Sequence, residues 1–268
     1  MTSRRTGRLL VHHYGDTAGS PLVVLHGITD SGACWGDLVE RLGATYHVVA
    51  PDALGHGGSD RFTPEELASA YPSEAMYDAA AVVLREVGPA LVLGHSMGGR
   101  TAAALAAREP ELVTGVVLED PAWFDTSPWG QDDRVASQRA AEALVDAADQ
   151  EGAIRRCRAE HPTWPDSELG PWARAKADSD VAFLRTSSLA LRQTWQETAA
   201  AIGVPALVVT GDGAVILGPS TRAEIAALGN PHLEIAVVPG ADHCVRRDRG
   251  DAFHAVVDPW LAAHTSRD

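Results

Sequence analysis

The sequence predicts an α/β fold with a mostly parallel central sheet flanked by helices. Short apolar runs alternate along the chain with segments of helical periodicity, which is typical of strands joined by helical crossovers. The runs are apolar almost throughout, as expected of strands that are buried on both faces. We expect strands at 21–26, 46–50, 90–94, 114–119, 205–211 and 232–238, an antiparallel edge strand at 8–15, and helices at 34–43, 73–87, 97–108, 219–228 and 251–264.

The composition excludes several classes of partner. The 268 residues carry a formal net charge of -14, and Lys176 is the one lysine. Nucleic acids and anionic membranes require clustered positive charge, so we expect a small-molecule substrate and neither of those partners. The first residues hold no apolar stretch of signal-peptide length, which favours a cytoplasmic location. The oligomeric state stays open.

The cysteines and histidines predict neither a disulfide framework nor a metal site. The three cysteines, Cys34, Cys157 and Cys244, are odd in number and far apart in the chain. No cluster of histidines and carboxylates has the spacing of metal ligands. We therefore expect no metal and no other cofactor.

The segment 123–198 interrupts the alternation of strands and helices. It contains helical patterns, several prolines and five of the seven tryptophans. We interpret it as a helical cap, inserted into a core formed by 1–122 and 199–268. Apolar pockets favour aromatic linings, so some of these tryptophans are candidates for substrate contact. The candidates for substrate binding are Trp123, Trp129, Trp164 and Trp195 in this segment, and Asp30 and Ile216 in core loops.

A G-x-S-x-G motif follows the strand expected at 90–94. It reads Gly94-His95-Ser96-Met97-Gly98, and a helical pattern begins directly after it. A strand, a tight turn and a helix raise a serine hydroxyl above the sheet, and glycines allow the close approach of the backbone. This context makes Ser96 a candidate nucleophile.

Two further motifs end other strands at the same edge of the sheet. The first is Leu25-His26-Gly27-Ile28, whose loop can aim the backbone N–H of Ile28 at the same point as the N–H of Met97. Two such converging donors would stabilise an oxyanion. Gly240-Ala241-Asp242-His243 follows the last strand. His243 can reach Ser96 across the carboxyl ends of the strands, where α/β sheets bind ligands.

Together with Asp52-Ala53-Leu54-Gly55-His56-Gly57-Gly58-Ser59, these motifs resemble the α/β-hydrolase superfamily, in its branch with a serine nucleophile, a helical cap and esterase or lactonase activity. The resemblance covers nearly the whole chain. It implies that Ser96 is the nucleophile, that His243 is the general base and then acid, and that 123–198 is the cap.

The sequence departs from the common superfamily pattern at the acid. Alanine stands at position 214, where most members carry an aspartate, and Asp212 is two residues early. Another branch takes its acid from the end of the preceding strand, and Asp120-Pro121-Ala122 resembles the motif of that branch. Glu119 and Asp120 should point to opposite faces of the strand, so only one can face His243. We expect Asp120 to be the acid, with Asp212 and Glu119 as alternatives.

Three functions follow from these residues. The first is a serine hydrolase that cleaves an ester or lactone of a small to medium, largely apolar or aromatic substrate through an acyl-enzyme. In the second, the same Ser96 and His243 act as acid and base in a carbon–carbon hydrolase, or in a lyase that resembles the menaquinone-pathway SHCHC synthases through Gly94–Arg100. The third is a non-catalytic sensor with the hydrolase fold.

Overall fold

The core of the protein is a mixed sheet of eight strands in the computed structural model, which describes residues 1–124, 133–186 and 188–265. The strand order is β1-β2-β4-β3-β5-β6-β7-β8. The pairs β1–β2 and β2–β4 are antiparallel, and the other pairs are parallel. The strands are β1 (Thr2–Thr6), β2 (Leu9–Gly15), β3 (Ser20–Leu25), β4 (Tyr46–Pro51), β5 (Ala90–His95), β6 (Val113–Glu119), β7 (Ala206–Gly211) and β8 (Leu233–Val238). The predicted fold class is confirmed.

The first strand is the one that the sequence pattern missed. Four of the five residues of β1 are exposed, because it is an edge strand that pairs only with β2. A strand with one open edge and polar side chains carries no apolar signal. Each of the other expected strands is present, within one residue at each end. The strand expected at 8–15 is antiparallel as predicted, but it lies between β1 and β4, and β1 forms the edge in its place.

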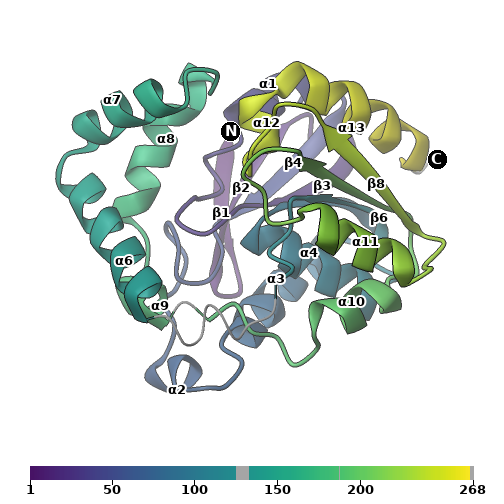
Figure 1. Cartoon of the computed structure of the whole chain (residues 1–268), viewed down its shortest axis with the longest axis horizontal. Coiled ribbons are helices and arrows are strands. Elements are labelled where there is room, and N and C mark those ends of the chain that lie inside the picture. The colour runs from purple at the N-terminus through teal and green to yellow at the C-terminus, as the bar shows by residue number, and fades with distance from the viewer. Residues whose placement is uncertain (125–132, 187, 266–268) are drawn as a thin grey trace.

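Helices cover both faces of the sheet, and each face has its own apolar layer (Figure 1). Successive residues of β3 alternate between the layers: Val23 and Leu25 lie in one, Leu22 and Val24 in the other. The first layer includes side chains of α3 (Ser73–Val87), α4 (Met97–Arg108), α10 (Trp195–Ala201) and α11 (Pro219–Ala227), and the second those of α1 (Gly36–Leu42) and α13 (Gly250–His264). The short helices α2 (Pro64–Leu67) and α12 (Val245–Asp248) lie in loops.

A group of helices between β6 and β7 stands beside the sheet, on the left of Figure 1. These insertion helices are α6 (Asp133–Ala148), α7 (Gln150–Glu160), α8 (Asp166–Ala177) and α9 (Val181–Thr186). The next helix, α10, packs instead against α4 of the core. The end of the predicted cap segment therefore lies with the core.

Buried ion pairs join the insertion helices to the core. Glu168 of α8 is fully buried and accepts hydrogen bonds from two arginines of α12, from Arg246 and, at 2.6 Å, from Nε of Arg247. Arg247 also donates to Asp30 at 3.0 Å. Both arginines are also buried, so these carboxylates offset the free-energy cost of removing their guanidinium groups from water.

The three cysteines are free. Across residues 1–124, 133–186 and 188–265, no three His, Cys, Asp or Glu side chains form a group able to hold a metal ion, and no helix is long and apolar enough to cross a membrane.

Candidate active site

Ser96 lies in a strained turn between β5 and α4. Its φ of 53° and ψ of -114° fall in a region that residues other than glycine rarely adopt. The neighbouring backbone is too close for side chains: a Cβ on Gly98 would overlap the carbonyl of Leu25, and one on Gly94 would overlap the carbonyl of Gly98. The glycines of the motif thus permit the turn, and strain at a turn of this kind is typical of a functional site.

Hydrogen bonds connect Ser96, His243 and Asp120. Nε2 of His243 lies 3.0 Å from Oγ of Ser96, and its Nδ1 lies 2.6 Å from Oδ2 of Asp120. A carboxylate only accepts, so Nδ1 carries the hydrogen and Nε2 is left to accept the serine hydroxyl. This is the arrangement that lets a histidine take the proton of a serine nucleophile.

Asp120 is held by three further donors. It is fully buried, at the end of β6. Its Oδ1 accepts from the hydroxyl of Thr210 at 2.7 Å and from the N–H of Leu217 at 3.1 Å, and its Oδ2 accepts from the N–H of Ile216 at 2.9 Å. These donors stabilise the ionised carboxylate and fix its orientation toward the imidazole.

The two alternative acids lie elsewhere. Asp212 accepts from the N–H of Gly240 at 2.7 Å and so braces the loop that precedes His243. Glu119 points away from Asp120, as alternation along the strand predicts, and accepts from the N–H of Arg246 at 2.7 Å. Burial raises the pKa of Glu119 above its ordinary value, although Arg246 opposes this. Of the three carboxylates, the structure brings Asp120 to His243.

The two predicted oxyanion donors flank Ser96. Met97 follows it as the first residue of α4, and Ile28 lines the same cavity as Ser96. The loop before Ile28 runs against the serine turn, since a Cβ on Gly27 would come within 2.7 Å of Nδ1 of His95. That the N–H groups of Ile28 and Met97 bind an oxyanion stays a prediction.

His95 supports the backbone of His243. Its Nε2–H donates to the His243 carbonyl at 3.2 Å, and the two ring centroids are 4.8 Å apart. Burial, together with the charge of His243, lowers the pKa of His95 well below its ordinary value, so this ring is neutral. A neutral neighbour adds no charge that would oppose protonation of His243 during a reaction.

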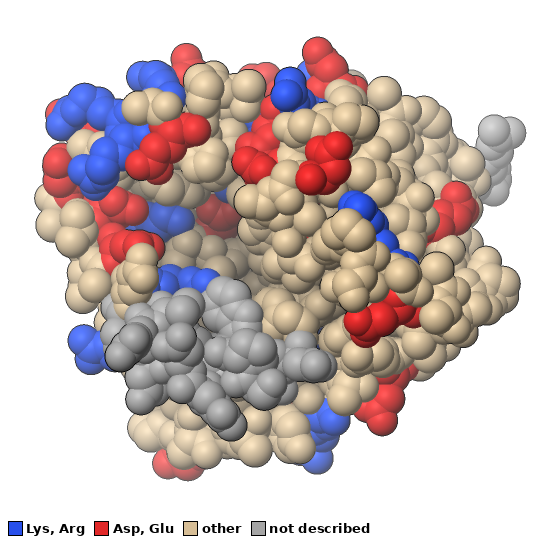
Figure 2. Space-filling view, in the orientation of Figure 1, with Lys and Arg blue, Asp and Glu red and all other residues tan. Residues whose placement is uncertain are grey.

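A cavity of about 290 Å³ opens above Ser96. Three of the predicted substrate-binding residues line it, namely Asp30, Trp164 and Ile216. Its described lining comprises Gly27, Ile28, Thr29, Asp30, His95, Ser96, Ala122, Phe124, Arg139, Trp164, Trp172, Lys176, Leu189, Ile216, His243, Cys244 and Arg247. Figure 2 shows the surface hollowed between the insertion helices and the core, with charged side chains inside the hollow.

Two of the predicted substrate contacts are corrected. Trp123 and Trp195 lie in the core, 1% and 4% exposed, with stacked rings whose centroids are 5.7 Å apart. They join the segment after β6 to α10, and neither belongs to the described lining of the cavity. The fourth candidate, Trp129, lies outside the described residues.

Sequence reasoning missed the charged part of the cavity. Lys176, Arg139 and Arg247 line it together with Asp30, although a largely apolar substrate was expected. Burial raises the pKa of Asp30, but Arg247 and Lys176 reverse this and bring its pKa to about 2. The one signal available in the sequence was that Lys176 is its single lysine.

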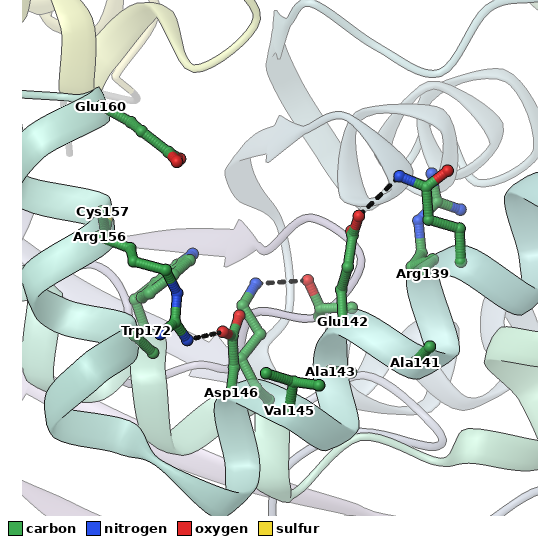
Figure 3. A pocket seen from close by; sticks show the side chains of 14 residues that line it. Arg139, Ala141, Glu142, Ala143, Val145, Asp146, Arg156, Cys157, Glu160 and Trp172 are labelled. Atoms are coloured by element: carbon green, nitrogen blue, oxygen red, sulfur yellow. Dashed lines mark hydrogen bonds and ion pairs between the residues drawn. The ribbon is translucent and has the colours of Figure 1, made fainter.

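A second cavity, of about 580 Å³, lies among the insertion helices (Figure 3). Its walls come from α6, α7 and α8, and Figure 3 shows Arg156 reaching Asp146, with a hydrogen bond of 2.8 Å. Thr29, Arg139, Trp172 and Lys176 line both cavities. The two spaces therefore meet at these four residues.

Comparisons with known proteins agree with this geometry. A family model described as the alpha/beta hydrolase family matches residues 22–256. The 2-(acetamidomethylene)succinate hydrolase of Mesorhizobium japonicum is 30% identical, over 91% of this chain and 89% of that protein. The N-formylmaleamate deformylase of Pseudomonas putida is 27% identical, over 91% of this chain and 89% of that protein.

A solved structure shows the same fold over almost the whole chain. The crystal structure of E-2-(acetamidomethylene)succinate hydrolase superposes with a TM-score of 0.76 and 26% identity, and the match covers 97% of this chain and 99% of that one. The similarity therefore includes both the sheet and the segment between β6 and β7.

Proposed function

The chain belongs to the alpha/beta hydrolase family, and from that premise we propose that it is a serine hydrolase that cleaves an ester or lactone bond. The observation that carries the proposal is the hydrogen-bonded series from Ser96 Oγ through His243 to Asp120. A buried carboxylate, an oriented imidazole and a hydroxyl on a strained turn are together the requirements for nucleophilic acyl transfer.

The reaction begins when Ser96 attacks the carbonyl carbon of the substrate. His243 accepts the serine proton and Asp120 stabilises the imidazolium that forms. The N–H groups of Ile28 and Met97 stabilise the oxyanion, and His243 then donates the proton to the leaving oxygen. Water attacks the acyl-enzyme with His243 as base, which releases the acid and regenerates Ser96.

The substrate is a small to medium molecule that binds beneath the insertion helices, which act as the cap. Its aromatic or apolar part contacts Trp164, Trp172 and Phe124, and the scissile carbonyl lies over Ser96. The chemistry needs only the side chains and the backbone amides named, so we propose that the enzyme works without a cofactor.

A second candidate is the hydrolysis of an acyl C–N bond. Two relatives that span the chain support it, since their names describe the hydrolysis of an acetamido compound and a deformylation. The same acyl-enzyme serves both bond types, with nitrogen as the leaving atom in place of oxygen. A lyase of the SHCHC type is less well supported, because its acid is expected after β7. The aspartate there, Asp212, accepts a hydrogen bond from the N–H of Gly240 and not from His243.

The test is intact-mass analysis after treatment with a small fluorophosphonate. We expect one covalent adduct on the wild type and none on Ser96→Ala, with both proteins shown to be folded by circular dichroism. A panel of esters, lactones and N-acyl compounds then identifies the bond. An unmodified wild type that is folded and active in another assay would exclude an activated Ser96.

A further inference from the structure

We propose that Lys176 binds a carboxylate group of the substrate at the junction of the two cavities, so that the enzyme selects anionic acyl compounds. The inference deepens the proposed function and rests on it for the reaction. It concerns a residue outside the series of Ser96, His243 and Asp120.

The position of Lys176 is well defined. It lies in the last turn of α8, and its Nζ donates to the hydroxyl of Thr29 at 2.6 Å and lies 4.5 Å from the centre of the Trp172 ring. Lys176 and Thr29 line both cavities, and Thr29 directly follows Ile28, the proposed oxyanion donor. A group held by Lys176 is therefore within the space that opens onto Ser96.

The lysine has a charge without a close counter-ion in the described part of the protein. No carboxylate of the described side chains forms an ion pair with Nζ within the 4.0 Å that such a pair requires. The acids that influence its titration are already paired: Asp30 with Arg247 at 3.0 Å and Asp146 with Arg156 at 2.8 Å. A cation in this state gains most from an anion supplied by a ligand.

The solvation of Lys176 points the same way. Burial lowers its pKa below the ordinary value, and Asp30 opposes this shift. No direct contact with a carboxylate of the described side chains offsets the free-energy cost of burying the ammonium group. A bound carboxylate would supply that contact and offset the cost.

Thr29 completes the binding site with a second donor. Its oxygen accepts from Lys176, which leaves its hydroxyl hydrogen free to point into the cavity. A carboxylate could then accept from the ammonium group with one oxygen and from the hydroxyl with the other. The hydrogen bond of 2.6 Å holds this hydroxyl beside the lysine, and Thr29 itself has a left-handed backbone, with a φ of 63°.

The first test measures binding without turnover. The affinity of succinate and of adipate is determined by calorimetry for Ser96→Ala, alone and combined with Lys176→Met, Lys176→Gln or Lys176→Arg. We expect Lys176→Met and Lys176→Gln to weaken binding about 10- to 100-fold, the range for loss of a charge-assisted hydrogen bond, and Lys176→Arg to retain most of it. Arg155→Met is the matched control, because it removes an exposed charge from α7.

The second test measures selectivity. Wild type and variants are assayed with monomethyl adipate and methyl hexanoate, which share a chain of six carbons and differ in the terminal carboxylate. We expect Lys176→Met to lower kcat/KM for the anionic ester about 10- to 100-fold more than for the neutral ester.

The outcomes separate the two proposals. The role of Lys176 would be overturned if neither dicarboxylate bound to Ser96→Ala. It would also be overturned if Ser96→Ala bound them with the same affinity with and without the additional Lys176→Met substitution, both proteins being folded. An equal fall for both esters would assign Lys176 a structural role. Lysine-dependent binding without turnover of any ester, lactone or amide would instead overturn the hydrolase and leave the carboxylate site in place.

Discussion

Nδ1 of His243 lies 2.6 Å from Oδ2 of Asp120, although the aspartate directly follows β6 and the histidine follows β8. The strand between them, β7, contributes the hydroxyl of Thr210, which donates to Asp120 at 2.7 Å. A neighbouring strand thus supplies a donor that orients the carboxylate, and the histidine reaches across it. Substitutions at the ends of these strands therefore have distinct expected effects.

Replacement of Asp120 by asparagine should abolish most of the activity. The neutral amide cannot stabilise the imidazolium. Its NH₂ group is itself a donor, and it would lie against N–H or O–H groups that donate to the carboxylate in the wild type. We expect kcat to fall by about 10⁴-fold, on the scale known for loss of the acid in serine proteases. The measurement is the rate of fluorophosphonate labelling and of ester turnover.

Asp212→Asn is the matched control for this prediction. Asp212 accepts from Gly240 in the loop before His243, so we expect a change in kcat of less than about tenfold. If Asp212→Asn were the more damaging variant, the acid would have to be reassigned.

Gly98→Ala should damage both stability and labelling. Its Cβ would overlap the carbonyl of Leu25, so the turn that carries Ser96 has to move. We expect a loss of about 1–3 kcal/mol in the free energy of unfolding and much slower reaction with a fluorophosphonate. Gly203→Ala is the control, since nothing lies within 4 Å of its added Cβ. Normal labelling of Gly98→Ala would contradict the tight turn.

Glu168→Gln should destabilise the protein strongly. The carboxylate is buried between Arg246 and Arg247, and its loss leaves two buried cations without their shared partner. We expect a fall of about 3–5 kcal/mol in the free energy of unfolding, measured with urea. Asp166→Asn in the same helix breaks an exposed pair with Arg158 and should cost less than about 1 kcal/mol. Equal losses in the two variants would show that the buried pairs contribute no special stability.

The sheet and its strand ends could be predicted because their signals are local. A strand buried on both faces must be apolar, and the turn at Ser96 admits only glycine at positions 94 and 98. The same reasoning predicted that Asp120 and Glu119 point in opposite directions. In the structure Asp120 bonds to His243 and Glu119 to the N–H of Arg246.

The lining of the cavity could not be predicted, because it depends on how separate helices pack. Trp123 and Trp172 belong to the same tryptophan-rich segment, yet the first is buried against Trp195 and the second faces the cavity. Lys176 reaches the cavity from α8, a helix that ion pairs of Glu168 join to the core. Such contacts join residues far apart in the chain, and no periodicity within one helix reports them.

The stability of the protein should fall between pH 7 and pH 5 because of His56. Its Nδ1–H donates to the carbonyl of Leu54 at 3.0 Å, and its ring is fully buried beside His26 and Phe183. Burial, reinforced by the charge of His26, lowers the pKa of His56 from 6.5 to about 3. Below pH 6.5 the unfolded chain binds a proton there that the folded protein does not, so acid favours unfolding.

This single group should remove about 2 kcal/mol of stability between pH 7 and pH 5, at about 1.4 kcal/mol for each pH unit below the unfolded pKa. The check is urea unfolding at pH 7, 6 and 5 for the wild type, for His56→Asn and for His232→Asn. The amide of His56→Asn can still donate to Leu54 but does not titrate, so its stability should depend less steeply on pH. His232 is exposed, and its replacement should leave the slope unchanged. A slope for His56→Asn equal to that of the wild type would show that His56 binds its proton equally well in the folded protein, in which case the buried ring would have to gain a water or carboxylate partner on acidification.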